Sequence, residues 1–197
     1  MPGTVRPGGR TARVRRAVME AVEDALVEGG FGALDLGSIA RRAGVGRATV
    51  YRRWGTVTEL VVDLLADMAQ LSLPRARSGS LREDLRANAR LVGRTLRDRR
   101  QGAVFRAVIA AATAEPSAAA ALHGFYRVRL DEWAPVVEEA IERGEVPVGT
   151  DAREVVAATA APLYYRLLLS GGVIDRAAAD RAADAAYAAA VAGVFVP

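Results

Sequence analysis

Apolar side chains recur at intervals of three and four residues along most of the chain. Within residues 11–28, for example, Val14, Val18 and Val22 would share one face of a helix. No segment shows the regular alternation that is typical of a half-buried strand. We therefore expect an all-α fold of about nine helices, at approximately residues 11–28, 35–43, 47–54, 56–71, 81–99, 102–114, 117–143, 151–170 and 176–195.

Capping residues mark several of the expected helix starts. Asp35 and Asp175 are expected to accept hydrogen bonds from the first free amides of the helices that follow them. Pro162 should kink or locally distort its helix, because proline has no amide proton to donate. A capping box, in which the first side chain caps the third following amide and a glutamate reaches back, is expected in three segments: Thr56 to Glu59, Ser80 to Glu83 and Asp151 to Glu154.

Charge is divided unevenly along the chain. The net charge is +4, and all 27 basic residues are arginines. Residues 1–54 hold ten arginines and five acids, whereas residues 55–197 hold 17 arginines and 18 acids. A basic module joined to a nearly neutral one is typical of a head that binds a polyanion and a body with another task. Charge alone is equally compatible with a solvated basic face.

Residue content argues against several classes of function. The chain has no cysteine and one histidine, His123, so we expect no metal site and no cofactor. An enzyme is disfavoured because no nucleophile–base arrangement, phosphate loop or paired-carboxylate site stands out. No apolar run reaches the roughly 18 residues that a membrane span needs, and no signal peptide follows the basic N-terminus. We expect a cytoplasmic protein that does not contact a membrane.

The most informative segment is IARRAGVGRATVYRRW, residues 39–54. It predicts two short helices joined by a glycine-containing turn, which is the helix-turn-helix arrangement. Five small or apolar side chains would pack the two helices together: Ile39, Ala40, Ala43, Val45 and Val50. The second helix would then present Arg47, Ala48, Thr49, Tyr51, Arg52 and Arg53 outward. Such residues suit a major groove, since arginine can read guanine and the hydroxyls can bond phosphate.

Residues Arg15 to Leu65 resemble the tetracycline-repressor (TetR) family of DNA-binding regulators. The resemblance rests on the helix ending in GGF, on LDLGSIARRAGVGRATVYRRW, and on the Glu-Leu pair at 59–60. It implies that Arg47 reads bases and that Thr49 and Tyr51 contact phosphates. It further implies base or phosphate contacts in the rest of the DNA-binding set, which comprises Gly37, Ser38, Ala48, Arg52 and Arg53.

Two positions depart from the family's pattern. The family often has serine at Gly46 and a basic residue at Val57, and both losses should weaken DNA binding somewhat. The positive charge of Arg52 and Arg53 would compensate, as would three arginines near the N-terminus, Arg6, Arg10 and Arg13. Residues 1–10 are expected to form a flexible basic arm. Its arginines could reach a minor groove, although a disordered charged tail is the better interpretation.

The resemblance implies a division into a DNA-binding head and a regulatory body. We expect the helix-turn-helix domain at residues 11–55 and a regulatory and dimerisation domain at residues 56–197. By resemblance, the last two helices would join two subunits into a homodimer. Two heads would then read a palindromic operator with half-sites roughly 34–36 Å apart, or a multiple of that spacing. A small-molecule effector would release such a repressor from DNA, although an activator with the same head remains an open alternative.

Six residues are candidates for an effector pocket. Asn88 and Arg129 are polar residues on otherwise apolar helix faces, and the aromatic candidates are Phe105, Tyr126, Trp133 and Tyr164. Ordinary core packing is the better explanation for each aromatic residue, and an ion pair with Glu132 is equally compatible with Arg129. A row of arginines is interpreted as a solvated face rather than a contact with an anionic partner: Arg82, Arg86, Arg90, Arg94 and Arg97.

Overall fold

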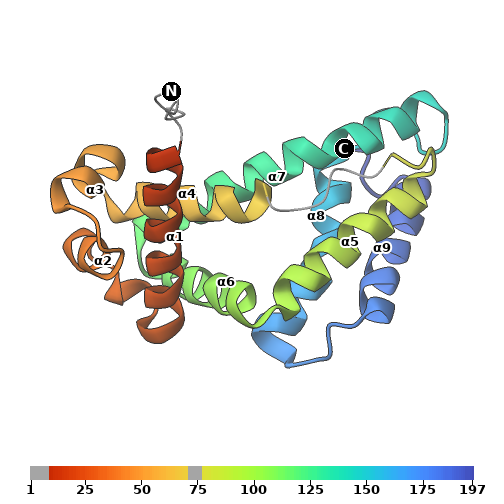
Figure 1. Cartoon of the computed structure of the whole chain (residues 1–197). Helices are drawn as coiled ribbons and strands as arrows, with labels where there is room; N and C mark the ends of the chain where they lie inside the picture. The colour runs from red at the N-terminus through yellow and green to blue at the C-terminus, as the bar shows by residue number, and fades with distance from the viewer. Residues whose placement is uncertain (1–8, 71–76) are drawn as a thin grey trace, which may run out of the picture. The chain divides into compact units, whose positions relative to one another are not determined.

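A computed structural model describes residues 9–70 and 77–197, and over these residues the chain is built from nine α-helices without strands (Figure 1). The helices are α1 (Gly9–Gly29), α2 (Leu36–Arg42), α3 (Arg47–Trp54), α4 (Val57–Gln70), α5 (Leu81–Arg97), α6 (Arg99–Ala112), α7 (Pro116–Glu142), α8 (Ala152–Tyr165) and α9 (Arg176–Val191). A 3₁₀ turn (Phe31–Ala33) follows α1, and a π-helical turn (Arg166–Ser170) follows α8. The prediction of an all-α fold with nine helices is confirmed.

Some expected features fall outside the described residues. The expected arm is described only from Gly9 onward, where the chain is already part of α1. The end of the helix predicted at 56–71 also lies beyond the last described residue before the gap, Gln70. Within residues 9–70 and 77–197, no helix is long and apolar enough to cross a membrane.

The chain divides into two compact units, which we describe separately. The first contains residues up to Met68 together with Ala103–Phe125, and the second contains Ala69–Gly102 and Tyr126–Pro197. In the first unit, α1 packs against α2, and α2 packs against α3. Its fully buried side chains come from every one of these helices and from α4 and α6, among them Val18, Val22, Ile39, Val50, Leu60, Leu65 and Phe105.

In the second unit, α5, α8 and α9 pack against one another. The buried face of α9 consists of alanines, namely Ala178, Ala179, Ala182, Ala183, Ala186 and Ala190. Small side chains let helices approach closely, and the larger side chains of α5 and α8, such as Leu85 and Leu163, complete the core. The alanine-rich last helix therefore forms a tight contact within the chain.

Most of the expected helix caps are present. Asp35 accepts a hydrogen bond from the amide of Ser38, and Asp175 accepts one from that of Ala178. Thr56 caps the amide of Glu59 at 3.1 Å, and the Asp151 carboxylate accepts from two amides of α8. The capping box expected at Ser80 is wrong, because its side chain makes no cap hydrogen bond. A distant carboxylate takes its place: Glu145 accepts from the amide of Leu81 at 3.0 Å.

Helix α9 ends at Val191, four residues earlier than expected. Gly193 has a φ of +76°, a left-handed conformation that only glycine adopts without cost. The amide of Val194 donates to the carbonyl of Ala189 at 3.0 Å, which is typical of a glycine-terminated helix. Helix α8 runs through Pro162 in α geometry, and the change to π geometry begins at Arg166, about one turn later.

Candidate nucleic-acid interface

The core between α2 and α3 holds the two helices in a fixed arrangement. Ile39, Ala40 and Val50 are almost completely buried, as the sequence predicted. Between the helices the chain turns at Gly44, whose φ of +64° explains why glycine stands there. The amide of Val45 donates to the carbonyl of Ala40 at 3.0 Å and closes the turn. Together these contacts make the helix-turn-helix rigid.

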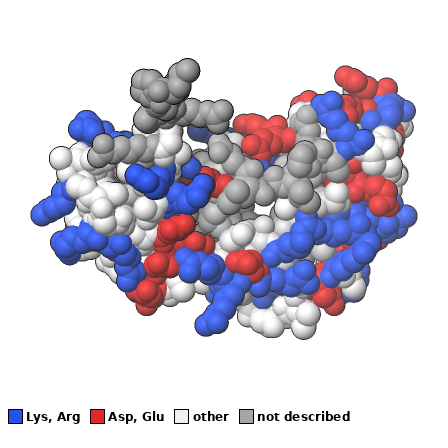
Figure 2. All heavy atoms as spheres, in the orientation of Figure 1, with Lys and Arg blue, Asp and Glu red and all other residues white. Residues whose placement is uncertain are grey.

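Helix α3 turns its polar side outward. Five of the six residues expected on that side are exposed, namely Arg47, Ala48, Tyr51, Arg52 and Arg53, and Thr49 is half-buried. The helix carries three arginines and no acid. Basic side chains are visible around α2 and α3 in Figure 2. The exposed side of α3 is therefore a positively charged surface that can contact nucleic acid without first unfolding.

Arg47 lies over its neighbour one turn along the helix. Its guanidinium carbon is 5.8 Å from the centre of the Tyr51 ring. The contact with the Tyr51 hydroxyl raises the pKa of Arg47 above its usual range, so the side chain is always charged. A Cβ atom at Gly37 would lie only 3.1 Å from Nη2 of Arg47, which shows how closely the start of α2 approaches this arginine. Gly37 is thus buried beside the expected base-reading residue.

The start of α2 is ordered by its own polar residues. The carboxylate of Asp35 accepts a hydrogen bond from the amide of Ser38 at 2.7 Å, and the hydroxyl of Ser38 accepts one from Arg41 at 2.8 Å. The start of α3 has no such cap, because Gly46 has no side chain. The amide of Thr49 donates instead to the carbonyl of Gly46 at 2.9 Å, and the helix start carries no side chain that would compete with a phosphate oxygen.

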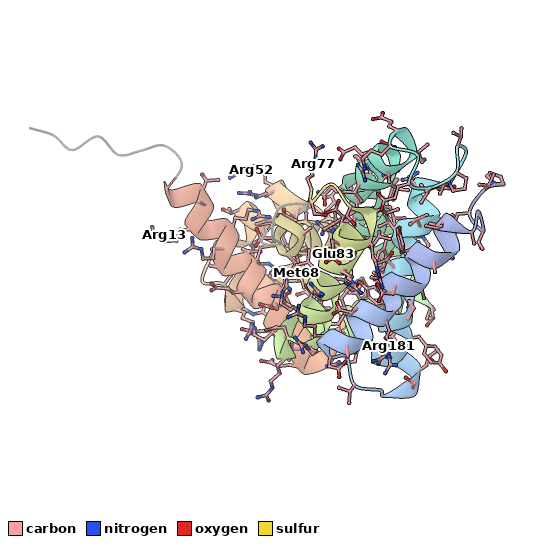
Figure 3. All side chains as sticks on the ribbon, turned by 90° about the vertical axis from the view of Figure 1, so that its right-hand side faces the viewer. Arg13, Arg52, Met68, Arg77, Glu83 and Arg181 are labelled. Carbon is pink, nitrogen blue, oxygen red and sulfur yellow. The ribbon has the colours of Figure 1, made fainter. Side chains whose placement is uncertain are left out.

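A surface groove of about 1010 Å³ separates the start of α1 from the helix-turn-helix. Three arginines line it, Arg13 from α1 and Arg52 and Arg53 from α3, and Figure 3 labels the first two. Its other lining residues are neutral: Thr11, Val14, Ala17, Ala43, Gly44, Val45, Gly46 and Thr49. Arg13 lies on α1, in the segment expected to be helical, and the groove suits a chain of phosphates.

A polar cluster that the sequence analysis missed joins α1, α3 and α4. Asp63 on α4 accepts hydrogen bonds from Trp54 Nε1 at 2.9 Å and from Arg15 Nη2 at 2.7 Å. Arg15 also pairs with Asp67. Burial opposes ionisation of Asp63, but the bonds from Arg15 and Trp54 outweigh it and hold its pKa below the usual range. The end of α3 is therefore tied to both neighbouring helices.

The six candidates for an effector pocket do not all lie in one unit. Phe105 belongs to the first unit, where its ring contacts Phe125 at 5.5 Å between centroids. The others belong to the second unit, where Asn88 and Trp133 are buried. Arg129 forms the ion pair with Glu132 that the sequence left open.

Two of these candidates are in direct contact. The rings of Tyr126 and Tyr164 meet edge to face at 5.5 Å. Burial raises the pKa of Tyr164 to about 12, and burial also raises the pKa of Tyr126 above its usual range. The charge of Arg129 acts on Tyr164 in the opposite direction. Tyr126, Arg129 and Tyr164 therefore form one cluster of two neutral hydroxyls and a cation.

The exposed basic helix on a rigid helix-turn-helix defines a DNA-binding protein. Comparison with known families agrees: residues 18–64 match the family described as "Bacterial regulatory proteins, tetR family", and residues 75–186 match "Tetracyclin repressor-like, C-terminal domain". The chain belongs to the TetR family of transcriptional regulators, which is not a family of enzymes.

Individual relatives support this assignment. The chain is 31% identical over 147 residues to the HTH-type transcriptional regulator AqdR of Rhodococcus erythropolis, which covers 75% of this chain and 70% of AqdR. It is 28% identical over 167 residues to the HTH-type transcriptional regulator YdeS of Bacillus subtilis, 84% of either chain. The crystal structure of the TetR-family regulator SCO0332 superposes with a TM-score of 0.71, at 25% identity over 89% of this chain and 97% of that one.

Proposed function

We propose that the protein is a homodimeric repressor that binds a palindromic operator and is released from it by a small-molecule ligand. The observation that carries the proposal is the exposed side of α3, where Arg47, Tyr51 and Arg52 project from a rigid helix-turn-helix. Arg47 would read a base in the major groove, and Thr49 and Tyr51 would bond phosphates. Gly37, Ser38, Ala48 and Arg53 would complete the contact surface.

Exposed apolar side chains support the homodimer. Near the end of α8 and after it, Tyr165, Leu169 and Val173 are 58%, 76% and 72% exposed. Val191 and Val194 add exposed apolar surface at the end of α9. Val191 and Val194 lie at the opposite end of α9 from Leu169 and Val173, since the amide of Asp151 at the start of α8 donates to the carbonyl of Phe195. Apolar side chains exposed at both ends of a helix pair are compatible with a protein–protein interface along it. A second copy of α8 and α9 would cover them, as the family resemblance implies.

The aromatic cluster of the second unit supports a ligand. Tyr126 and Tyr164 supply apolar faces with two neutral hydroxyls, and Arg129 supplies a cation beside them. Trp133 lies one turn further along α7, and we retain Asn88 and Phe105 as candidate lining residues. Ligand pockets combine apolar walls with a few polar groups in this way. A ligand releases the repressor only if it prefers a state of the dimer that does not fit the operator.

Selection of random DNA duplexes on the purified full chain tests the proposal. We expect a palindromic site bound by an even number of chains, with affinity that falls steeply as salt rises. Arg47→Ala should weaken binding to that site by about 1–3 kcal/mol and relax the preference at one base pair of each half-site. Arg127→Ala removes an exposed arginine of the second unit and should change nothing. Equal weakening on all sequences would overturn the base-reading role of Arg47.

Transcription from a reporter promoter that carries the selected site tests whether the protein represses transcription. We expect the wild-type protein to lower transcription and the Arg47→Ala variant to lower it less. An increase in transcription with wild-type protein would show an activator instead, while leaving the DNA-binding assignment intact.

A further inference from the structure

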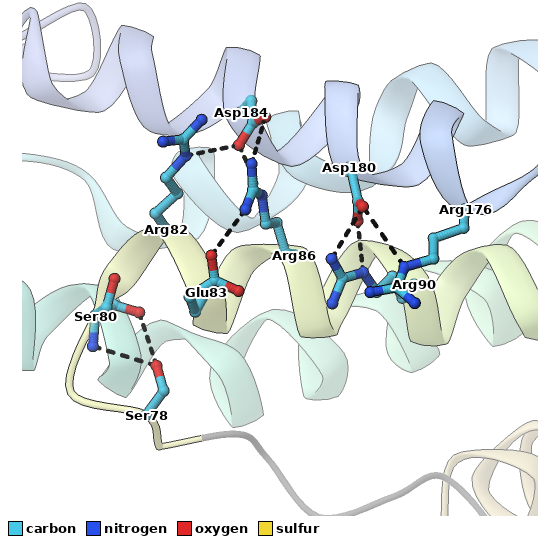
Figure 4. A network of polar contacts seen from close by, with 9 residues as sticks. All are labelled: Ser78, Ser80, Arg82, Glu83, Arg86, Arg90, Arg176, Asp180 and Asp184. Atoms are coloured by element: carbon cyan, nitrogen blue, oxygen red, sulfur yellow. Dashed lines mark hydrogen bonds and ion pairs between the residues drawn. The ribbon is translucent and has the colours of Figure 1, made fainter.

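The arginine row along α5 divides into two parts, of which Figure 4 shows the first, Arg82, Arg86 and Arg90. Arg82 and Arg86 both donate to Asp184 of α9, each at 2.9 Å from Nε to Oδ1. One turn along, Arg90 donates to Asp180 through both Nε and Nη2. The interpretation of the row as a solvated face is therefore wrong for these three arginines, which join α5 to α9.

The last two arginines of the row, Arg94 and Arg97, are not paired in this way. Both are exposed, and among the described residues neither forms an ion pair or a side-chain hydrogen bond. They line a surface groove of about 300 Å³ between α5 and α9. The remaining lining residues are Arg90, Gly93, Asp175, Arg176 and Ala179.

The charge in this groove is unbalanced. Four guanidinium groups line it, and the nearby carboxylates are already engaged. Asp175 caps α9 by accepting from the amide of Ala178 at 2.7 Å, and Asp180 is shared by Arg90 and Arg176, which leaves Arg94 and Arg97 without a carboxylate among the described residues. Arg90 and Arg94 are four residues apart on one helix, and like charges at that spacing repel each other. The sequence thus keeps cations together where an anion would relieve their repulsion.

We propose that this groove is a binding site for a small anion that carries phosphate groups. The planar guanidinium donates two parallel hydrogen bonds to a phosphate, and Arg94 and Arg97 retain all their donors for such a ligand. The volume is at the lower end of the range for small-molecule sites, which suits a compact anion. The site is separate from the exposed side of α3 and from the cluster of Tyr126 and Tyr164, so it does not depend on the proposed repressor mechanism.

Isothermal titration of the full chain with inorganic pyrophosphate, at constant ionic strength, tests this site. We expect saturable binding by the wild-type protein. The double variant Arg94→Gln/Arg97→Gln should bind about tenfold more weakly or worse, because it loses two charge-assisted contacts. A matched control, Arg127→Gln/Arg181→Gln, removes two exposed arginines of the same unit that do not line the groove (Arg181 is labelled in Figure 3). The control should bind as wild type does.

Two further measurements separate the groove from other basic surfaces. Arg52→Gln/Arg53→Gln removes two cations from the DNA-binding surface and should leave the groove's affinity for pyrophosphate unchanged. Thermal unfolding without anion should give the Arg94→Gln/Arg97→Gln variant a melting temperature equal to or slightly above that of wild type, since repulsion is removed. That result shows that weaker binding is not a consequence of misfolding.

Three results would overturn the proposal. The first is the absence of saturable pyrophosphate binding by wild-type protein at millimolar concentrations. The second is an equal loss of affinity in the groove variant and the matched control, which would show a general effect of net charge. The third is binding of citrate as tight as that of pyrophosphate, which would contradict recognition of phosphate.

Discussion

At the scale of single residues, the DNA-binding surface depends on contacts that side chains make with one another before DNA arrives. Arg47 is held against Tyr51 and beside Gly37. A long arginine side chain loses less conformational freedom on binding when its neighbours already restrict it. The neighbours of Arg47 are therefore expected to affect DNA affinity even where they do not themselves touch a base.

Gly37→Ala should separate DNA affinity from stability. The new Cβ would lie 3.1 Å from Nη2 of Arg47 and 3.2 Å from Oδ2 of Asp35, so the guanidinium has to move. Alanine is the better helix former, and the free energy of unfolding should change by no more than about 1 kcal/mol, with either sign. Affinity for the selected operator should fall severalfold. Gel-shift titration and urea unfolding measure the two quantities, and unchanged DNA affinity would show that the position of Arg47 is unimportant.

Tyr51→Phe should weaken binding to every sequence alike. The hydroxyl is exposed and can reach a phosphate oxygen, and its loss should cost about 0.5–1.5 kcal/mol on both specific and random duplexes. Titration of both kinds of duplex with the same variant gives the comparison. Tyr187→Phe, on α9, is the control. A loss confined to one base pair of the operator would contradict the phosphate role and show that the hydroxyl acts on a base, directly or by holding Arg47.

The exposed residues of α3 were predictable from sequence because their pattern is local. Helical spacing alone placed Val50 inside and Arg47, Tyr51 and Arg52 outside. The cluster around Asp63 was not predictable in this way. Arg15 and Asp63 are 48 residues apart, and no local pattern indicates that an acid and an arginine on two different helices will meet. Such pairs become visible only once the helices are packed.

At the scale of helices, Asp63 connects three elements with one carboxylate. Asp63→Asn should lower the free energy of unfolding by about 1–3 kcal/mol, because it weakens bonds to a charged partner in a site that is only 27% exposed. Asp67→Asn should cost less, since Asp67 contacts Arg15, whereas the Trp54 indole donates to Asp63. Urea unfolding of the two variants at neutral pH measures the difference. Equal losses would mean that the link to α3 contributes little.

The lowered pKa of Asp63 also makes the free energy of unfolding depend on pH. Bonds from Arg15 and Trp54 hold the folded-state pKa of Asp63 below its unfolded value near 3.9, despite the opposing effect of burial. Its contribution is therefore complete above that value and is lost as pH falls through the folded pKa. The hydrogen bonds from Arg90 lower the pKa of Asp180 and those from Arg86 and Arg82 lower that of Asp184, so these two add to the loss.

Urea unfolding between pH 7 and pH 2 measures this dependence. We expect wild-type stability to decline below about pH 4, and Asp63→Asn to decline less steeply, because the variant has one fewer carboxylate to protonate. If both proteins lose stability in parallel, Asp63 is not one of the groups responsible.

At the scale of the whole molecule, helix number and type were predictable, whereas several helix ends were not. Amphipathic spacing is a local signal, so it indicates a helix whatever the arrangement of the helices in the fold. A helix end depends on what else is near it. Glu145 caps α5 from 64 residues away in place of Ser80, and Gly193 ends α9 before Phe195, where the sequence predicted its end.

For the candidate effector residues too, positions along one helix were predictable from sequence, whereas contacts between helices were not. Tyr126, Arg129 and Trp133 were correctly placed along one helix, α7, by their spacing. The contact of Tyr126 with Tyr164 depends on how α7 and α8 pack, and that lies beyond any local pattern. Whether these residues line a ligand pocket stays a prediction.

The homodimer is the last prediction at this scale, and it rests on apolar side chains that are exposed within residues 9–70 and 77–197. Leu169→Asp/Val173→Asp places two carboxylates on that surface, and burying them in an interface would carry a large desolvation cost. We expect monomers by light scattering at micromolar concentration, with helical content unchanged by circular dichroism. Val128→Asp, at an exposed position of α7, should remain dimeric.

The Leu169→Asp/Val173→Asp variant also tests whether the two subunits of the proposed homodimer act together on DNA. A monomer retains its helix-turn-helix but presents one head, so it should lose affinity for a palindromic site by a large factor while binding a single half-site as weakly as one wild-type head does. Monomers that still bind the palindrome tightly would show that pairing on DNA does not need this surface. Wild-type-like dimers of Leu169→Asp/Val173→Asp would place the interface elsewhere on the molecule, and the apolar surface after α8 would then need another partner.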